Sequence, residues 1–209
     1  MSNLCIKYFA KQIIFLANKK KGGNVLKATG VVRRIDDLGR IVIPKEIRRT
    51  LRIKEGDPLE IFTDKEGEII LKKYSPIGEL SEFATGYAET LSKTTGHIAC
   101  ITDKDSVIAV SGGSKKEFLD QAISTELEKV IENKEVYTSN GNNRNALPIT
   151  QNDNKTAKYN SQVIYPIISD GDVIGSVILL SKEQNTKMGD TELKVVQSAA
   201  GFLSSQMEI

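Results

Sequence analysis

The segment that most constrains the fold runs from Lys27 to Tyr74, where short β-rich runs alternate with turn signals. The runs "ATGVVRRID" and "RIVI" predict two strands joined by the turn "DDLG", in which Gly39 can adopt a positive φ. The runs "LEIF" and "IILKK" predict a second pair of strands joined by "TDKEGE". Two hairpin-like halves of about fifty residues in all bury little surface of their own, so the segment predicts a dimer.

A short helix is expected between the two halves. Pro44 cannot donate a backbone hydrogen bond, so it ends the preceding strand and suits the first turn of a helix. Basic residues at helical spacing gather on one face of this helix: Lys45, Arg48, Arg49 and Arg52. On the charge pattern alone, an ordinary solvated surface explains these residues, with ion pairs to nearby acids: Asp36, Asp37, Glu46 and Glu55.

The distribution of charge is uneven although the net charge is only +2. Residues 1–26 carry five lysines and no acidic residue, and residues 27–76 carry twelve basic and nine acidic residues. Residues 77–209 carry twelve basic and eighteen acidic residues. Basic character is therefore confined to the amino-terminal third, which marks that end of the chain for contact with a polyanion.

The run "KATGVVRRIDDLGRIVIPKEIRRTLRIKEGDPLEIF" resembles the DNA-binding domain of AbrB-type bacterial transition-state regulators. The resemblance implies a swapped-hairpin β-barrel, in which two chains interleave their hairpins into one dimer. It also implies contact with double-stranded DNA through arginines, which by position are Arg33, Arg34, Arg40, Arg48 and Arg49. The planar guanidinium suits this role because it matches phosphate oxygens and guanine edges.

The first twenty-five residues have three explanations. A cationic, apolar start resembles a signal peptide, but Lys11 interrupts its apolar core. An additional amphipathic helix is the second explanation. The third is a translated leader or disordered extension: "KGG" can be encoded by a bacterial ribosome-binding sequence, and Leu26 by a TTG start codon. The initiator methionine usual in the resembled family falls at Leu26, so we favour a natural start there.

The remainder of the chain is expected to be α+β. Ser75–Pro76 opens a linking helix over residues 76–95, and residues 96–209 predict a separate domain. In that domain "HIACIT", "SVIAVS", "QVIYPII" and "DVIGSVILL" predict four strands. Ser114 and Glu117 fit a capping box that starts a helix running to about Asn133, and residues 138–160 are expected to form a long loop. This order predicts an antiparallel sheet with packed helices, a GAF-like or PAS-like module.

From residue 26 onward the chain is similar to sporulation regulators of spore-forming Firmicutes that join an AbrB-type domain to a GAF-like domain. The resemblance implies a cytoplasmic, nucleoid-associated regulator of the forespore that activates and represses genes. It also implies a GAF-like domain whose small ligand is undefined.

The last helix carries two apolar stripes. The first has coiled-coil spacing: Leu193, Val196, Ala200, Leu203 and Met207. The second consists of Val195, Ala199 and Phe202. If one stripe covers the sheet, the other needs a partner, and pairing of these helices would join two DNA-binding dimers into a tetramer. The alternative is one wide stripe that faces the core.

No catalytic constellation is evident, so we expect no enzyme, and neither a cofactor nor a metal site is indicated. His97 precedes an alternating apolar strand, Cys100 reads as a small buried residue of that strand, and the two cysteines lack metal-ligand spacing. No apolar run reaches the roughly 20 residues of a membrane span. An alternative function is a MazE-type antitoxin, which uses the same swapped barrel. A small-molecule enzyme built on the GAF-like part is a third.

Overall fold

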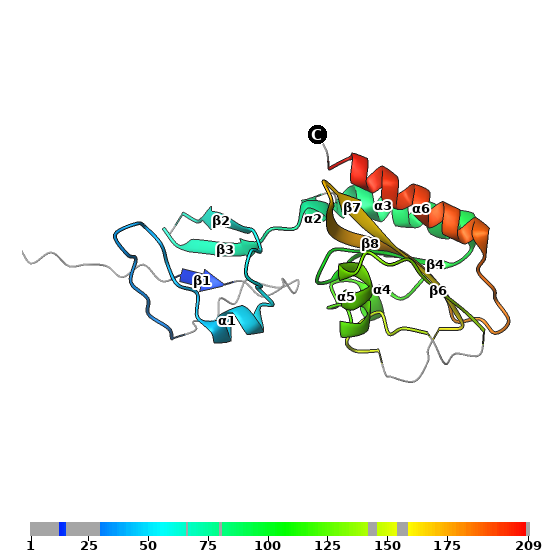
Figure 1. The fold of residues 1–209 in the computed structure, drawn as a ribbon, viewed down its shortest axis with the longest axis horizontal. Helices are drawn as coiled ribbons and strands as arrows, with labels where there is room; N and C mark the ends of the chain where they lie inside the picture. Colours follow the sequence, from blue (N-terminus) through cyan, green and yellow to red (C-terminus); the bar gives the residue numbers. More distant parts are fainter. Residues whose placement is uncertain are drawn as a thin grey trace, which may run out of the picture. The chain divides into compact units, whose positions relative to one another are not determined.

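The computed structural model describes residues 13–15, 30–65, 67–79, 81–141, 146–153 and 159–207. The chain divides into two compact units, Met1–Tyr74 and Ser75–Ile209, and each is described by itself (Figure 1). The prediction of a leader over residues 1–25 lies outside the described residues, apart from the backbone of Ile13–Phe15.

The sheet of the first unit contains the predicted second hairpin. Strands β2 (Leu59–Thr63) and β3 (Ile69–Lys73) pair antiparallel, from Leu59 opposite Lys73 to Thr63 opposite Ile69. Strand β1 (Ile13–Phe15) adds to the free edge of β3 in parallel. Helix α1 (Lys45–Thr50) follows Pro44, as expected.

The two strands predicted before α1 are absent from the described chain, so that prediction was wrong for the single chain. Residues 30–36 and 40–44 have no regular secondary structure. Several of their β-branched side chains stay exposed, with Val32 at 79% and Val42 at 72%. Strand residues need a neighbouring backbone for their hydrogen bonds, and no described strand of this chain pairs with the segment.

A partly buried ion pair fixes the connection between α1 and β2. Arg52, just past the helix end, has a φ of +54°, and Lys73 Nζ lies 3.3 Å from its carbonyl oxygen. The same Nζ lies 3.1 Å from Asp57 Oδ2, which also accepts the Lys54 backbone N–H at 2.8 Å. These contacts tie the end of β3 to the connection that follows α1.

The second unit is built on a five-stranded antiparallel sheet in the order β5–β4–β8–β7–β6. The strands are β4 (Ile98–Thr102), β5 (Val107–Ser111), β6 (Tyr137–Asn140), β7 (Ser161–Ser169) and β8 (Asp172–Ser181). The four predicted strands are confirmed, and β6 is an addition within the segment expected to be a loop. Asp170 and Gly171, both with positive φ, form the tight turn between β7 and β8.

Helices cover both faces of this sheet and create two cores (Figure 1). Helices α2 (Pro76–Glu79), α3 (Ser81–Thr95) and α6 (Asp190–Ser205) pack on one face, and α4 (Lys115–Phe118) and α5 (Thr125–Glu132) on the other. Successive residues of β8 belong to opposite cores: Leu179 lies in the same core as Leu203, and Leu180 lies in the same core as Phe118. The central strands are therefore buried on both sides.

The helix predicted from Ser114 to about Asn133 is two helices. Ser114 forms no side-chain cap, and the helix ends at Phe118, followed by Leu119 in an extended conformation and Asp120 with a φ of +60°. Ala122 and Ile123 instead make β-bridges to Ser106 and Thr150. Helix α5 then starts afresh at Ser124, whose Oγ accepts the Leu127 N–H at 3.0 Å.

Gly175 permits a close approach between β8 and β4. A Cβ atom at this position would lie 2.0 Å from the carbonyl oxygen of Thr102. The neighbouring Ser176 hydroxyl forms a buried hydrogen bond of 2.8 Å with the Thr102 hydroxyl. Any side chain at position 175 would force the two central strands apart.

Candidate nucleic-acid interface

The turn at residues 36–40 is fixed by one side chain, that of Asp36. Its Oδ1 accepts the backbone N–H groups of Leu38 at 3.0 Å and of Arg40 at 2.7 Å. Its Oδ2 accepts the Nε–H of Arg40 at 2.8 Å. Two backbone bonds close the turn, from Asp36 N–H to the Arg40 oxygen and from Gly39 N–H to the Asp36 oxygen. Gly39 has a φ of +76°, the conformation expected of it.

The electrostatics of the turn favour an ionised Asp36. The Arg40 backbone N–H and guanidinium, together with the Leu38 N–H, hold the pKa of this carboxyl below its usual range. Arg40 itself remains 70% exposed along its side chain. The predicted contact residue is therefore held in place yet open to solvent.

Arg33 and Arg34 lie in the irregular segment before the turn, and both are exposed. No ion pair of either residue is found within the described part of the chain. Neutralisation by neighbouring acids, the ordinary explanation of such residues, therefore holds for Arg40 but not for these two arginines.

Helix α1 separates the remaining basic residues. Lys45 and Arg49 are exposed, whereas Arg48 is half-buried and its Nε has no hydrogen-bond partner among the described residues. Arg52 lies beyond the helix end in a left-handed conformation, so it does not continue the basic face that the spacing predicted. The helical part of the candidate interface is thus Lys45, Arg48 and Arg49.

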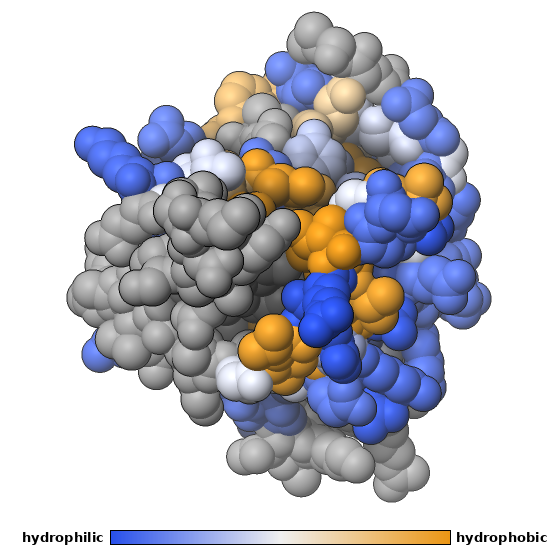
Figure 2. Space-filling view, turned by 90° about the vertical axis from the view of Figure 1, so that its left-hand side faces the viewer, coloured by the Kyte–Doolittle hydropathy of each residue, from blue (hydrophilic) through white to orange (hydrophobic). Residues whose placement is uncertain are grey.

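Apolar side chains are also exposed in the unit that carries these arginines. The largest exposures in the irregular segment belong to Val32, Ile35, Leu38 and Val42, at 62% or more. Ile61 and Phe62 of β2 are exposed as well. Figure 2 shows apolar side chains gathered on one face of this unit among hydrophilic ones. A monomeric protein rarely leaves such a surface open to water.

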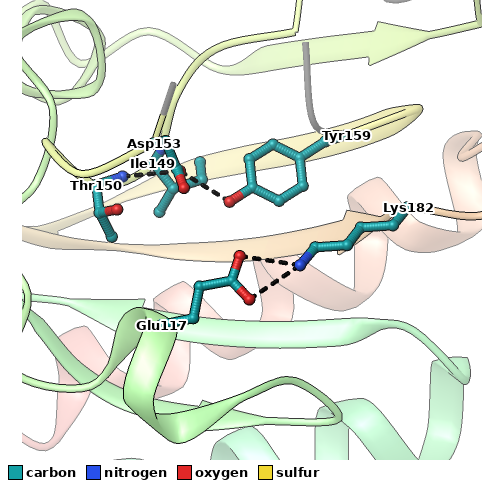
Figure 3. A network of polar contacts seen from close by, with 6 residues as sticks. All are labelled: Glu117, Ile149, Thr150, Asp153, Tyr159 and Lys182. Atoms are coloured by element: carbon teal, nitrogen blue, oxygen red, sulfur yellow. Dashed lines mark hydrogen bonds and ion pairs between the residues drawn. The ribbon is translucent and has the colours of Figure 1, made fainter. Parts of the chain in front are cut away.

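A second cluster of polar groups lies on the α4 face of the second unit (Figure 3). Lys182 pairs with Glu117, and its Nζ lies 5.7 Å from the centre of the Phe118 ring. Tyr159 donates its hydroxyl to Asp153 Oδ2 at 2.8 Å. Asp153 Oδ2 also accepts the N–H groups of Ile149 and Thr150, at 2.9 and 3.1 Å. The sequence analysis did not identify this cluster, because Glu117, Asp153 and Lys182 come from three separate segments of the chain.

The chemistry of that cluster is structural. Burial raises the pKa of the Cys100 thiol and that of the Tyr159 hydroxyl, so both stay protonated at neutral pH. A protonated, fully buried thiol is a poor nucleophile. Among the described residues, no group of three or more histidine, cysteine, aspartate or glutamate side chains is arranged to hold a metal ion.

Three aromatic rings stack on the outer surface of α3 and α6. The Phe202 ring centre lies 5.6 Å from that of Phe83 and 5.4 Å from that of Tyr87, with interplanar angles of 24° and 13°. Phe83 and Phe202 are 44% and 38% exposed. The predicted coiled-coil stripe is instead largely core, because Val196 and Leu203 are both fully buried. We refer to Phe83, Tyr87 and Phe202 as the aromatic cluster.

Two family profiles match the chain. Residues 79–208 match the family described as "Stage V sporulation protein T C-terminal, transcription factor". Residues 32–79 match the family described as "Antidote-toxin recognition MazE, bacterial antitoxin". The first match spans more than half of the chain.

Curated relatives agree with both matches. The chain is 52% identical to stage V sporulation protein T of Bacillus subtilis over 183 residues, which is 88% of this chain and 99% of that protein. It is 63% identical to the transition state regulatory protein AbrB of the same organism over 51 residues. The latter match covers 24% of this chain and about half of that protein, 52%.

The fold of the second unit matches solved GAF domains. The GAF domain from an Acinetobacter phosphoenolpyruvate-protein phosphotransferase aligns with a TM-score of 0.52 and 13% identity, covering 66% of this chain and 84% of that chain. The predicted GAF-like fold is therefore confirmed, and the overall class is α+β as expected. Among the described residues, no helix is long and apolar enough to cross a membrane.

Proposed function

Because the chain belongs to the stage V sporulation protein T family of transcription factors, we propose that it activates and represses sporulation genes by binding specific DNA sequences. The contacts are made by Arg33, Arg34, Arg40, Arg48 and Arg49. The observation that carries this proposal is the exposed side chain of Arg40, held by Asp36, together with two exposed arginines, Arg33 and Arg34, that lack acidic partners in the described chain.

Arginine contacts predict how the affinity for DNA depends on salt concentration and on base sequence. Each phosphate contact releases counterions, so affinity falls with salt concentration, whereas base contacts discriminate between sequences. In the full chain, Arg49→Ala should weaken binding to a selected duplex, and Lys129→Ala on the exposed face of α5 should not. Fluorescence anisotropy over a salt series measures both. Equal affinities of the two variants would contradict a role for α1.

The exposed apolar residues of the first unit support a dimer. Val32, Ile35 and Val42 stand in segments of strand-forming sequence that have no strand partner in the single chain. A second copy that interleaves its own segment supplies backbone partners and covers these side chains, which is the swapped-hairpin barrel that the family resemblance implies. The two copies together present two sets of the DNA-contacting arginines, suited to a two-fold symmetric site.

The second unit joins two such dimers into a tetramer. The aromatic cluster is exposed on α3 and α6, and large stacked rings are typical of the centre of protein interfaces. A second copy offers the same surface, so the contact is self-complementary.

The second unit also senses a small ligand of undefined class. As a transcription factor the protein acts in the cytoplasm on the nucleoid, within the forespore.

A MazE-type antitoxin is the second candidate, favoured by the profile match over residues 32–79. An antitoxin binds a protein toxin, and a toxin gene next to this one would support it. The folded unit from Ser75 onward favours the regulator, since its match to the sporulation family is much longer. A genome-wide map of occupied DNA sites separates the candidates: binding confined to the gene's own promoter would favour the antitoxin.

A further inference from the structure

We propose that Asp36 is a positioning residue, which orients Arg40 for a two-point contact with a pair of acceptor atoms on DNA. The inference rests on the proposed DNA-binding function. It assigns to an acidic residue, in the middle of a surface that binds a polyanion, a role in choosing the sequence.

One carboxylate fixes both the backbone and the side chain of Arg40. Asp36 Oδ1 holds the Leu38 and Arg40 N–H groups, and Oδ2 holds the Arg40 Nε–H. The turn is the same one that Gly39 closes through its positive φ. The direction of the guanidinium is therefore set relative to the turn from which it projects.

The contact uses only the inner nitrogen of the guanidinium. Within the described residues, no hydrogen bond is found to either terminal amino group of Arg40, and the side chain is 70% exposed. These two amino groups form a planar fork. Such a fork matches two adjacent acceptors, either O6 and N7 of guanine or two oxygens of one phosphate.

The pair is poorly explained by stability. An exposed ion pair between residues four apart contributes little to folding, because water and salt screen it. It also places a negative charge where DNA would approach, which weakens the general attraction. Its useful effect is to restrict the rotamers of Arg40 before binding, which lowers the entropy lost on contact.

The adjacent acid provides a matched control. Asp37 is exposed and carries the same charge one residue further along. Asp36→Asn keeps an Oδ1 acceptor for the turn but loses the charge and sets an amide N–H₂ or a neutral oxygen against the Arg40 Nε–H. Electrostatics alone predicts that Asp36→Asn and Asp37→Asn both strengthen DNA binding. If Asp36 positions Arg40, Asp36→Asn instead weakens binding to the target DNA, whereas Asp37→Asn strengthens it.

The probe is the duplex that the wild-type full chain enriches from a randomised library, compared with a scrambled duplex of equal composition. We expect Asp36→Asn to bind the enriched duplex about tenfold more weakly than Asp37→Asn does. The two variants should bind the scrambled duplex equally, with the same thermal unfolding midpoint. Equal affinities for the enriched duplex would overturn the inference.

Further variants distinguish failure of the positioning role of Asp36 from failure of the proposed DNA-binding function. If the wild type enriches no duplex, the proposed function fails and the inference with it. If Arg40→Ala weakens binding to the enriched duplex but Asp36→Asn does not, only the positioning role is lost. In an Arg40→Ala background, Asp36→Asn should cause no further loss, since the two residues act as a unit.

Modified duplexes identify the acceptor pair. Replacement of guanines by 7-deazaguanine removes N7, and methylphosphonate linkages remove a charged phosphate oxygen. Suppose that one modification weakens binding by the wild type but does not weaken binding by Asp36→Asn. This result would support the two-point contact and would identify the acceptor atoms as those that the modification removes. Sensitivity that is identical in wild type and Asp36→Asn for both modifications would contradict it.

Discussion

Lys182, which follows β8, makes a two-point ion pair with Glu117 of α4: its Nζ lies 2.9 Å from Oε1 and 3.0 Å from Oε2. The same ammonium lies 5.7 Å from the centre of the Phe118 ring and 6.0 Å from that of Tyr159. The end of the central strand is thus joined to a helix of only four residues.

Removal of this ammonium should destabilise the second unit modestly. The side chains are 37% and 23% exposed, so solvent screens the ion pair, and we expect Lys182→Met to lower the free energy of unfolding by about 1 kcal/mol. Lys182→Arg should retain most of the stability. Urea unfolding measures the loss, with Lys129→Met as control, and equal midpoints for the two methionine variants would count against the contact.

Gly175 should be nearly irreplaceable, whereas another glycine of the same unit should not. Gly175→Ala places Cβ 2.0 Å from the Thr102 oxygen, and we expect a loss of about 3 kcal/mol in the free energy of unfolding. Gly201→Ala meets nothing within 4 Å on the exposed side of α6 and should stabilise the helix by about 1 kcal/mol. Calorimetry of both variants checks the opposite signs; a Gly175→Ala protein as stable as wild type would refute the close approach.

The aromatic cluster should control assembly. We expect Phe202→Glu to convert the proposed tetramer into a dimer, because it places a charge among stacked rings that a second copy would cover in that assembly. Light scattering measures the mass, and Val136→Glu, at a residue 46% exposed, is the control. A Phe202→Glu variant that remains tetrameric would remove the cluster from the interface. Leu203→Glu is unsuitable, since this fully buried side chain belongs to the core.

The turn at Asp36 should persist in mildly acidic solution. Its pKa is depressed in the folded chain, so its contribution is fully present above the ordinary aspartate value of about 3.9 and is lost as pH falls through the lower, folded value. Carbon-detected NMR of the Asp36 carboxyl measures the titration. Arg40→Ala should move the midpoint upward, and an unchanged midpoint would show that the guanidinium does not hold the carboxylate.

Much of the second unit could be predicted from sequence because its pattern is local. The β-branched runs of β7 and β8 are long and are separated by the turn at Asp170–Gly171, so the apolar pattern and the turn residues predict the same strand boundaries. No glycine or proline in the sequence marks the break between α4 and α5. Asp120 adopts a positive φ without glycine or proline nearby, because the bridges of Ala122 and Ile123 to distant residues override helix propensity.

The first unit shows where prediction of the fold from the sequence fails. Val32 and Val42 have strand-forming character, yet the single chain leaves them without strand partners, because propensity does not supply a neighbouring backbone. At the candidate interface, the family pattern named Arg33 and Arg40, which the structure leaves exposed. It could not place Arg52 outside the helical face, which depends on where α1 ends.

The pairing of Asp36 with Arg40 also bears on how a regulator finds its site in a genome. Most DNA that it meets is non-target sequence bound only by electrostatic attraction, and an acid beside Arg40, the proposed contact residue, weakens that background binding. Fewer molecules are then sequestered on irrelevant sequence, and each dissociates sooner. A single carboxylate would thus shorten the search while sharpening the choice made at its end.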